Sequence, residues 1–333
     1  MSSTTFLVTG ANGYIGLHII KMALEKGYNV IGTVRSESSA QTIKDTFPEY
    51  TSPQLSTAIV KDITSAEQYK DVLDGVTAII HTASPFSFAA KDMKKEILDP
   101  AVAGAVAILE AAHKYGPSVN RVVSTSSFAS IVNLGEGNRE GYTYTEKDWN
   151  PMTYEVAATK DAVTAYAASK GLAEKAQWEW MEKNKPSFGF TSINPGWVFG
   201  PNVVALPISK LGQSSTLLWE LLDAKEVPAP DFRNGVDVRD VTAAHVLAAT
   251  NPKASGERFL LGQTFSWQKA ADAIRESMPE LKSRVPIEGP NSKTPGYEVD
   301  GSKSATVLGF TYTPLTETVK DSLTQYLNES LKA

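Results

Sequence analysis

A tyrosine and a lysine four residues apart, Tyr166 and Lys170, are the residues of this sequence best suited to proton transfer. They lie in a long amphipathic stretch, 159–182, so the spacing places both side chains on one face of a predicted helix. A free tyrosine, with a pKa of ~10, is a poor acid at neutral pH, but a nearby ammonium group lowers the pKa of a phenol. Such a pair could protonate a carbonyl oxygen while a hydride reaches the carbonyl carbon.

Hydroxyl-bearing residues at 125–127 follow a short β-branched run, 121–124, that predicts a strand. Ligands of open parallel sheets bind at the carboxyl ends of the strands, so Ser126 and Ser127 are expected at the rim of the same cleft. A serine hydroxyl there could donate to the oxygen on which negative charge develops. The combination of these serines with the tyrosine–lysine pair is more specific than either feature alone.

A glycine-rich loop with the spacing G-x-x-G-x-x-G separates the first predicted strand, 6–9, from the first predicted helix, 14–26. Glycines at these points permit a tight turn and let backbone N–H groups approach a pyrophosphate, and the start of the helix favours the same anion. The loop residues predicted to bind the cofactor are Gly10, Asn12, Gly13, Tyr14, Ile15 and Gly16.

The end of the second predicted strand, 29–34, decides between NAD and NADP. NAD-specific sites usually have Asp or Glu about 20 residues after the glycines. Here Arg35 and Ser36 follow the strand, and the first carboxylate is Glu37. An arginine can pair with a 2′-phosphate through its planar fork of donors, and the serine could add a hydrogen bond. We therefore predict NADP, as NADPH, for the cofactor.

Two later strand ends should join the same crevice. Asp62 and Ile63 follow the third strand and would bracket the adenine, with the Asp62 carboxylate accepting from the exocyclic amine. His81 ends the fourth strand and is predicted to be a buried, hydrogen-bonded histidine rather than a catalytic base. Small residues that let the backbone approach the cofactor come next: Thr82, Ala83 and Ser84.

The elements that must position these residues alternate regularly along the first part of the chain. Nearly continuous apolar runs predict strands at 6–9, 29–34, 57–60, 78–82, 121–124 and 190–194. Amphipathic stretches between them predict helices at 14–26, 38–47, 66–73, 99–115 and 159–182. This pattern is typical of an α/β Rossmann fold, a doubly wound parallel sheet that binds NAD(P).

Beyond residue 195 the chain is richer in proline and glycine, and its helical stretches are irregularly spaced. We predict an NADP-binding domain at 1–195, to which 237–262 returns through a strand at 257–261. The segments 196–236 and 263–333, with helices at 267–277 and 315–331, would form a smaller, mostly helical substrate region.

Composition excludes several other chemistries. The 333 residues contain no cysteine, and the four histidines stand at no metal-ligand spacing, so neither thiol nor metal catalysis is expected. A net charge of −5 argues against nucleic-acid binding. No apolar run reaches the roughly 20 residues of a membrane span, and the first residues lack a signal-peptide pattern. A cytoplasmic protein is predicted.

The sequence resembles the extended short-chain dehydrogenase/reductases, and within them the dihydroflavonol-reductase-like branch with the fungal methylglyoxal, aldehyde and ketone reductases. The segments that carry this resemblance cover most of the chain: 8–16, 81–86, 121–127, 166–170, 194–201 and 236–241. One departure is Ser39, where some relatives carry a lysine that would strengthen the grip on the 2′-phosphate.

The resemblance implies roles for the residues singled out above. Tyr166 would be the proton donor, and Lys170 would bind the nicotinamide ribose and tune Tyr166. Ser127, rather than Ser126, would polarise the carbonyl. The turn that includes Pro195 and Val198 would hold the nicotinamide.

Apolar side chains near the strand ends and the junction with the second region predict a hydrophobic substrate pocket over the nicotinamide. They are Phe86, Phe88, Phe128, Val163 and Trp197. For Arg239 and Asp240 we predict structural roles, with Asp240 capping the following helix and Arg239 pairing with a carboxylate.

These features predict an NADPH-dependent reductase of aldehydes and ketones, acting on hydrophobic or dicarbonyl small molecules as a monomer or homodimer. One alternative is a nucleotide-sugar epimerase or dehydratase, which would need a cationic cluster for a diphosphate. Residues 201–230 contain only two basic residues, Lys210 and Lys225, so they offer no such cluster. The other alternative is a regulator that binds NADP without turnover, but such a protein would typically lose the tyrosine or the lysine.

Overall fold

A parallel sheet of seven strands forms the centre of the molecule in a computed structural model, which describes residues 4–84, 90–229, 231–290 and 292–332. Its spatial order is β10-β7-β5-β4-β1-β2-β3. The strands are β1 (Thr5–Thr9), β2 (Asn29–Val34), β3 (Leu55–Ile59), β4 (Ala78–His81), β5 (Arg121–Thr125), β7 (Gly189–Pro195) and β10 (Glu257–Leu261). The strand order reverses between β1 and β4, which puts the binding crevice at their carboxyl ends. The predicted doubly wound α/β fold is confirmed.

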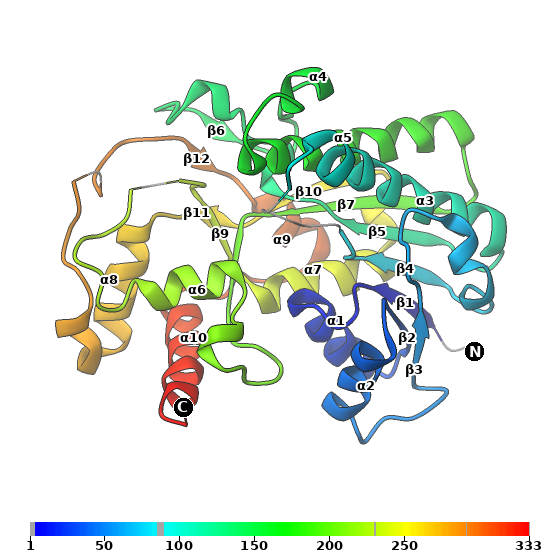
Figure 1. The fold of residues 1–333 in the computed structure, drawn as a ribbon, viewed down its shortest axis with the longest axis horizontal. Helices are drawn as coiled ribbons and strands as arrows, with labels where there is room; N and C mark the ends of the chain where they lie inside the picture. The colour runs from blue at the N-terminus through cyan, green and yellow to red at the C-terminus, as the bar shows by residue number, and fades with distance from the viewer. Residues whose placement is uncertain (1–3, 85–89, 230, 291, 333) are drawn as a thin grey trace.

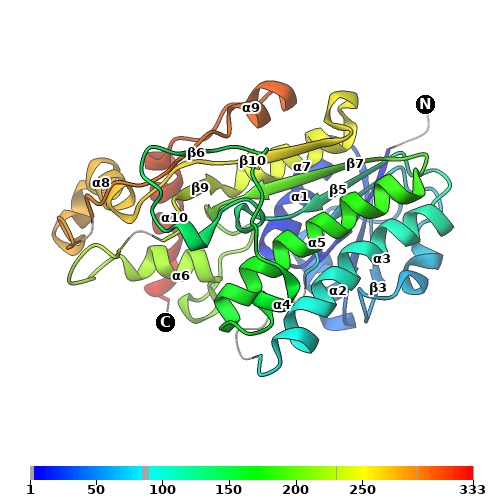
Figure 2. The ribbon, with the colours of Figure 1, turned by 90° about the horizontal axis from the view of Figure 1, so that it is seen from above.

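Helices cover both faces of this sheet (Figure 1). One face carries α1 (Tyr14–Glu25), α2 (Glu37–Thr46) and α7 (Val238–Thr250), and the other carries α3 (Asp99–Tyr115) and α5 (Ala162–Asn184), which lie side by side (Figure 2). Both faces are therefore buried, which explains why the strands read as nearly continuous apolar runs.

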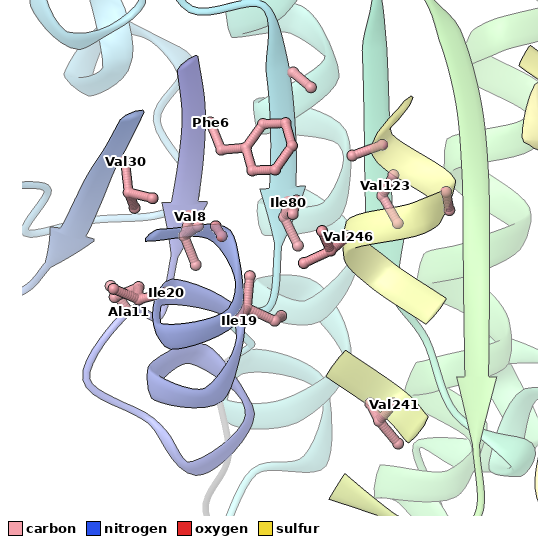
Figure 3. Packing of buried hydrophobic residues seen from close by; sticks show 14 of the residues in the cluster. Phe6, Val8, Ala11, Ile19, Ile20, Val30, Ile80, Val123, Val241 and Val246 are labelled. Carbon is pink, nitrogen blue, oxygen red and sulfur yellow. The ribbon is translucent and has the colours of Figure 1, made fainter. Parts of the chain in front are cut away.

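Side chains of β1 alternate between the two resulting cores. Phe6 and Val8 pack on the side of α1 and α7, near Ile19 and Val246 (Figure 3), whereas Leu7 packs on the side of α3. Because successive side chains of the strand point to opposite faces, β1 contributes apolar side chains to the cores on both faces of the sheet.

A second region lies beyond the end of the sheet that carries β10 (Figure 1). Its helices α6 (Gln213–Glu220), α8 (Trp267–Ser277) and α10 (Leu315–Ser330) share a separate core with Leu218, Trp267, Ile274 and Leu323. Two small sheets join it to the rest. One combines β8 (Trp197–Phe199), β9 (Asn234–Asp237) and β11 (Gln263–Thr264), and the other pairs β6 (Thr143–Tyr144) with β12 (Glu298–Val299). The short helix α4 (Tyr154–Ala157) packs against α5, and α9 (Ser302–Leu308) packs against α7 and β10.

The chain returns to the main sheet after the first part of the second region. β10 pairs in parallel with β7, with Arg258 opposite Ser192, so the predicted strand at 257–261 is confirmed. The division of the chain at residue 195 falls between β7 and β8 and stays a prediction.

Three local details differ from the sequence-based expectations. The helix expected at 66–73 is a 3₁₀ helix, η1 (Ala66–Val72). The long helix begins only at Ala162, because the Asp161 carboxylate accepts from the backbone N–H groups of Val163 and Thr164 and caps it.

The cap of α7 is also a correction. Asp237, not Asp240, caps this helix by accepting from the backbone N–H of Arg239 at 2.8 Å. Asp240 lies in the first turn and accepts from the backbone N–H and hydroxyl of Thr313 instead. Arg239 does pair with carboxylates, those of Asp237 and Asp321, as predicted.

Within the part of the chain that the structure describes, no helix is both long and apolar enough to cross a membrane. The same residues contain no cluster of three or more acidic or histidine side chains arranged to hold a metal ion.

Candidate active site

In the glycine loop between β1 and α1, the positions of Gly10 and Gly16 are unfavourable for any residue with a side chain. Gly10 has a φ of +63°, and a Cβ on Gly16 would lie 2.4 Å from the carbonyl oxygen of Gly10. Gly13 is the N-cap of α1, has no capping side chain, and is followed by no acidic residue in the first turn. The N–H groups at the start of α1 therefore remain available to an anion.

A groove of about 510 Å³ runs from this loop across the carboxyl ends of β1, β2, β3 and β4. This volume is within the range of cofactor sites. Nine of the predicted cofactor residues line it: Gly10, Asn12, Gly13, Arg35, Asp62, Ile63, Thr82, Ala83 and Ser84. The close glycine turn, the free helix start and the length of the groove fit a dinucleotide with its pyrophosphate at the loop.

The groove contains two exposed cations, Arg35 after β2 and Lys61 after β3. Neither has an ion-pair partner among the residues that the structure describes. Sequence reasoning missed Lys61, although its position directly before Asp62 at a strand end was a usable signal. The Ser36 hydroxyl caps α2 by accepting from the backbone N–H of Ser39, and it is Ser39 that lines the groove.

At the far end of the groove, the Asp62 carboxylate accepts from the hydroxyl of Thr64 at 2.6 Å and from its backbone N–H at 2.9 Å. These hydrogen bonds hold the pKa of Asp62 below its ordinary value, so the group is an ionised acceptor at neutral pH. Ile63 packs against Gly104 of α3, whose missing side chain leaves room for it.

The end of β4 is tied to the glycine loop. The Thr82 hydroxyl donates to the carbonyl oxygen of Thr9 at 2.6 Å, and the backbone N–H of Ala83 donates to the Thr9 hydroxyl. His81 Nδ1 lies 2.8 Å from the same hydroxyl, and burial together with the Lys170 charge lowers the pKa of His81 to about 4. The prediction of a buried, hydrogen-bonded histidine is confirmed.

The three hydroxyl residues at the end of β5, Thr125, Ser126 and Ser127, each have different surroundings. The Thr125 hydroxyl lies 2.7 Å from His245 Nε2, and the Ser126 hydroxyl donates to the Glu174 carboxylate at 2.6 Å. Ser127 is half-buried, and its hydroxyl accepts from the backbone N–H of Ala129 at 3.1 Å. The described residues give the Ser127 hydroxyl proton no acceptor, so Ser127 is the one of the three able to donate to a ligand.

Tyr166 and Lys170 lie on one face of α5, and the ammonium nitrogen of Lys170 is 5.3 Å from the centroid of the Tyr166 ring. The same nitrogen donates to the Ser84 hydroxyl at 2.8 Å, which ties α5 to the end of β4. A small cavity of about 30 Å³ is lined by residues 124–126, Ser84 and Lys170 together. The segment after β4, the end of β5 and the tyrosine–lysine helix therefore meet beside the cofactor groove.

Several predicted cofactor residues do not line the groove. The Tyr14 hydroxyl donates to the carbonyl oxygen of Gly200 at 2.8 Å, away from the loop, and Ile15 packs against the core. Pro195 ends β7, and Val198 lies in β8, where its carbonyl accepts from Ser214 at 2.6 Å. Neither Pro195 nor Val198 lines the groove.

The predicted substrate residues separate into four groups. Phe128 is 1% exposed and packs among Tyr144, Phe232 and Tyr297, so it offers no surface to a ligand in this structure. Val163 is 55% exposed, one turn before Tyr166. Phe86 and Phe88 lie outside the described residues.

Trp197 is half-buried, meets the Phe232 ring edge to face, and donates from its indole nitrogen to the Asp231 carboxylate at 3.2 Å. Burial raises the pKa of Asp231.

Comparison with known proteins places this site in a family. The model of the NAD dependent epimerase/dehydratase family matches residues 6–262, which include the glycine loop, the serines and the tyrosine–lysine pair. The chain belongs to this family. The match extends from Phe6 in β1 through β10.

Within this epimerase/dehydratase family, fungal reductases are similar over the full length. The NADPH-dependent methylglyoxal reductase GRE2 of Saccharomyces cerevisiae is 36% identical, with 96% of this chain and 97% of the relative covered. The ketoreductase azaE of Aspergillus niger is 35% identical, with 97% and 98% covered.

Solved structures give the same result. The crystal structure of yeast methylglyoxal/isovaleraldehyde reductase Gre2 complexed with NADPH has a TM-score of 0.91 and 34% identity, covering 99% of this chain and 100% of that one. Gre2 of Candida albicans in complex with NADPH has a TM-score of 0.88 and 34% identity, with coverage of 98% and 99%.

Proposed function

We propose that this chain is an NADPH-dependent reductase of aldehydes and ketones. The observation that carries the proposal is that residues 124–126, Ser84 and Lys170 line one cavity beside a groove that fits a dinucleotide, with Tyr166 next to Lys170 on α5. Its similarity to fungal reductases named for NADPH and for methylglyoxal or ketones supports the same activity.

Different residues of the groove bind different parts of the cofactor. The glycine loop and the start of α1 receive the pyrophosphate through backbone N–H groups. Arg35 holds the 2′-phosphate through its fork of donors, in a groove where no carboxylate follows β2 directly. Lys170, held by the Ser84 hydroxyl, would bind the nicotinamide ribose, and the Pro195–Val198 turn stays a prediction for the nicotinamide, because it lies outside the groove in this structure. When bound, NADPH supplies the hydride.

The protein's own contribution to the chemical step is proton transfer and orientation. The Tyr166 hydroxyl gives its proton to the carbonyl oxygen as the carbonyl carbon is reduced. The Lys170 ammonium, close to the Tyr166 ring, stabilises the phenolate that remains. Ser127 donates a hydrogen bond to the same oxygen and orients the carbonyl, since Thr125 and Ser126 are already engaged elsewhere.

A neutral, largely apolar carbonyl compound fits this site best. Val163 presents exposed apolar surface one turn from Tyr166, and Trp197 presents an indole next to an acidic group, Asp231. That carboxylate would disfavour substrates with their own negative charge. The assignment of Phe86 and Phe88 to the same pocket stays a prediction. The cytoplasmic location and the monomeric or homodimeric state also stay predictions.

The family also contains nucleotide-sugar enzymes, which must bind a diphosphate in the second region. The Arg233 side chain there is committed to the carbonyl oxygens of Tyr297 and Thr294, and Arg239 to Asp237 and Asp321. The engagement of these two arginines favours the carbonyl reductase over the epimerase or dehydratase.

The test is the loss of reduced-nicotinamide absorbance with a panel of aldehydes, diketones, aryl ketones and flavonoid-type ketones, using NADPH and NADH in parallel. Carbonyl-dependent oxidation of NADPH is expected, and Tyr166→Phe should abolish it. An enzyme that binds NADPH but oxidises it with no member of the panel would instead support a non-catalytic regulator. Turnover of a nucleotide sugar without net NADPH loss would support an epimerase.

A further inference from the structure

A buried carboxylate, Glu174, lies one helical turn beyond Lys170 on α5 and has no role in the proposed reaction. Tyr166, Lys170 and Glu174 follow each other at intervals of four residues, so they lie along one face of the helix. The Glu174 side chain is only 1% exposed. A charge so deeply buried is kept only where it is paired and fully hydrogen-bonded.

One carboxylate oxygen of Glu174 faces the serine turn. Oε2 accepts from the hydroxyls of Ser126 and Ser130, each at 2.6 Å, and from the side-chain amide of Asn194 at 2.6 Å. The Ser130 hydroxyl also lies 2.7 Å from the carbonyl oxygen of Ser127. Glu174 thus holds the residue before Ser127 and the residue three positions after it.

The other oxygen faces the sheet. Oε1 accepts from the Arg258 guanidinium at 2.6 Å, from the Ser192 hydroxyl at 2.7 Å and from the Trp178 indole at 3.3 Å. Arg258 is itself nearly buried and stacks on the Trp149 ring at 3.5 Å. Burial alone would raise the pKa of Glu174, but the Arg258 charge and the hydrogen bonds lower it overall, so the carboxylate is ionised.

The backbone around Ser127 is fixed by the same group of contacts. The Ser126 N–H donates to the carbonyl oxygen of Ile193 at 2.7 Å, and the Ser130 N–H donates to the carbonyl oxygen of Ser127 at 2.9 Å. With both flanking hydroxyls bound to Glu174, the turn has little freedom to move relative to α5.

We propose that Glu174 is a positioning residue, which holds Ser127 at the place relative to Tyr166 and Lys170 that carbonyl reduction requires. Its carboxylate links the helix that carries the proton donor to the turn that carries the orienting hydroxyl. The inference rests on the proposed function, because it assigns Glu174 its effect through Ser127.

A double-mutant cycle tests this coupling. Glu174→Gln and Ser127→Ala are made singly and together, and kcat is measured with the best aldehyde of the panel, alongside NADPH affinity by nicotinamide fluorescence. Misplacing a reacting group by an ångström costs on the order of 100-fold in rate, so Glu174→Gln should lower kcat by about this factor. NADPH affinity should change little, because Glu174 does not line the cofactor groove.

The decisive comparison is the Ser127→Ala background, where Glu174→Gln should cause no further loss of kcat, because the group it positions is gone. Losses that multiply would overturn the proposal. If Glu174→Gln does not fold, because Arg258 is left unpaired, Ser130→Ala takes its place in the cycle.

Ser192→Ala is the matched control, since it removes a hydroxyl from the same carboxylate on the side of the sheet. Its kcat should remain close to that of the wild type, because Arg258 and the Trp178 indole still hold Oε1. An equal loss in Ser192→Ala and Ser130→Ala would show a merely structural role. A wild-type protein that reduces no carbonyl would overturn the proposed function, and this inference with it.

Discussion

Acidification should destabilise this protein well above the pH at which most of its carboxylates are protonated, because two histidines are buried in the neutral form. His245 is fully buried, donates from Nδ1 to the carbonyl oxygen of Val241 at 2.7 Å, and accepts from Thr125 at Nε2. His81 is buried against Thr9. Burial lowers the pKa of each from 6.5 to about 4.

The sign and size of the effect follow from these shifts. The unfolded chain takes up a proton near pH 6.5, whereas the folded chain resists it until about pH 4, so the free energy of unfolding falls as the pH drops through this window. At a pH of about 5, each histidine costs ~2 kcal/mol relative to neutral pH. Asp240 acts in the opposite direction, because burial raises its pKa to about 6. Its protonation in the folded chain adds ~1.4 kcal/mol to the free energy of unfolding at this pH. A net loss of roughly 3 kcal/mol is expected.

Urea unfolding followed by tryptophan fluorescence, at a series of pH values from about 7.5 to about 5, measures this loss. In His245→Gln the amide oxygen can still accept from Thr125 but cannot titrate, so the pH-dependent loss should shrink by ~2 kcal/mol. Equal slopes in the wild type and His245→Gln would refute the reasoning.

Three further predictions concern the active site. Tyr166→Phe should abolish turnover and leave NADPH affinity nearly intact, which steady-state assays and nicotinamide fluorescence measure; retained turnover would exclude Tyr166 as the proton donor. Arg35→Ala should raise KM for NADPH by about 10- to 150-fold, the worth of a charge-assisted hydrogen bond, with little change for NADH. Equal effects on both cofactors would contradict the 2′-phosphate assignment. Gly16→Ala should weaken NADPH binding in a titration, because its Cβ would lie 2.4 Å from the Gly10 carbonyl oxygen, whereas Gly212→Ala, with nothing within 4 Å, should bind NADPH normally.

Local patterns were enough to predict most of the sheet and its helices. β2, α3, β10 and α8 have the predicted bounds, because a strand buried on both faces and an amphipathic helix each leave a periodic record in the sequence. Helix ends were less predictable. Asp237 precedes α7 and Asp240 lies in its first turn, and only the observed start of the helix at Val238 makes Asp237 the cap.

The meeting of the motifs was also predictable, since parallel strands end at one edge of a sheet. The surroundings of each side chain were not. Phe128 is an aromatic residue close to a strand end and was therefore a candidate for the pocket, but Tyr144 and Tyr297 from distant segments cover it. Likewise, nothing in the local sequence marks Glu174 as the partner of Arg258, 84 residues later. Such contacts depend on how the layers pack, which periodicity does not encode.

The pairing of Glu174 with Arg258 also bears on how the chain becomes active as it is synthesised. A nascent chain that has emerged to residue 195 already contains the glycine loop, Ser127, Tyr166 and Lys170, yet it lacks the strand that carries the counter-charge. Domains usually fold from the N-terminus during translation. Here the first 195 residues would leave a carboxylate without its cation beneath the serine turn. Completion of the catalytic geometry therefore waits for β10, and with it for much of the second region.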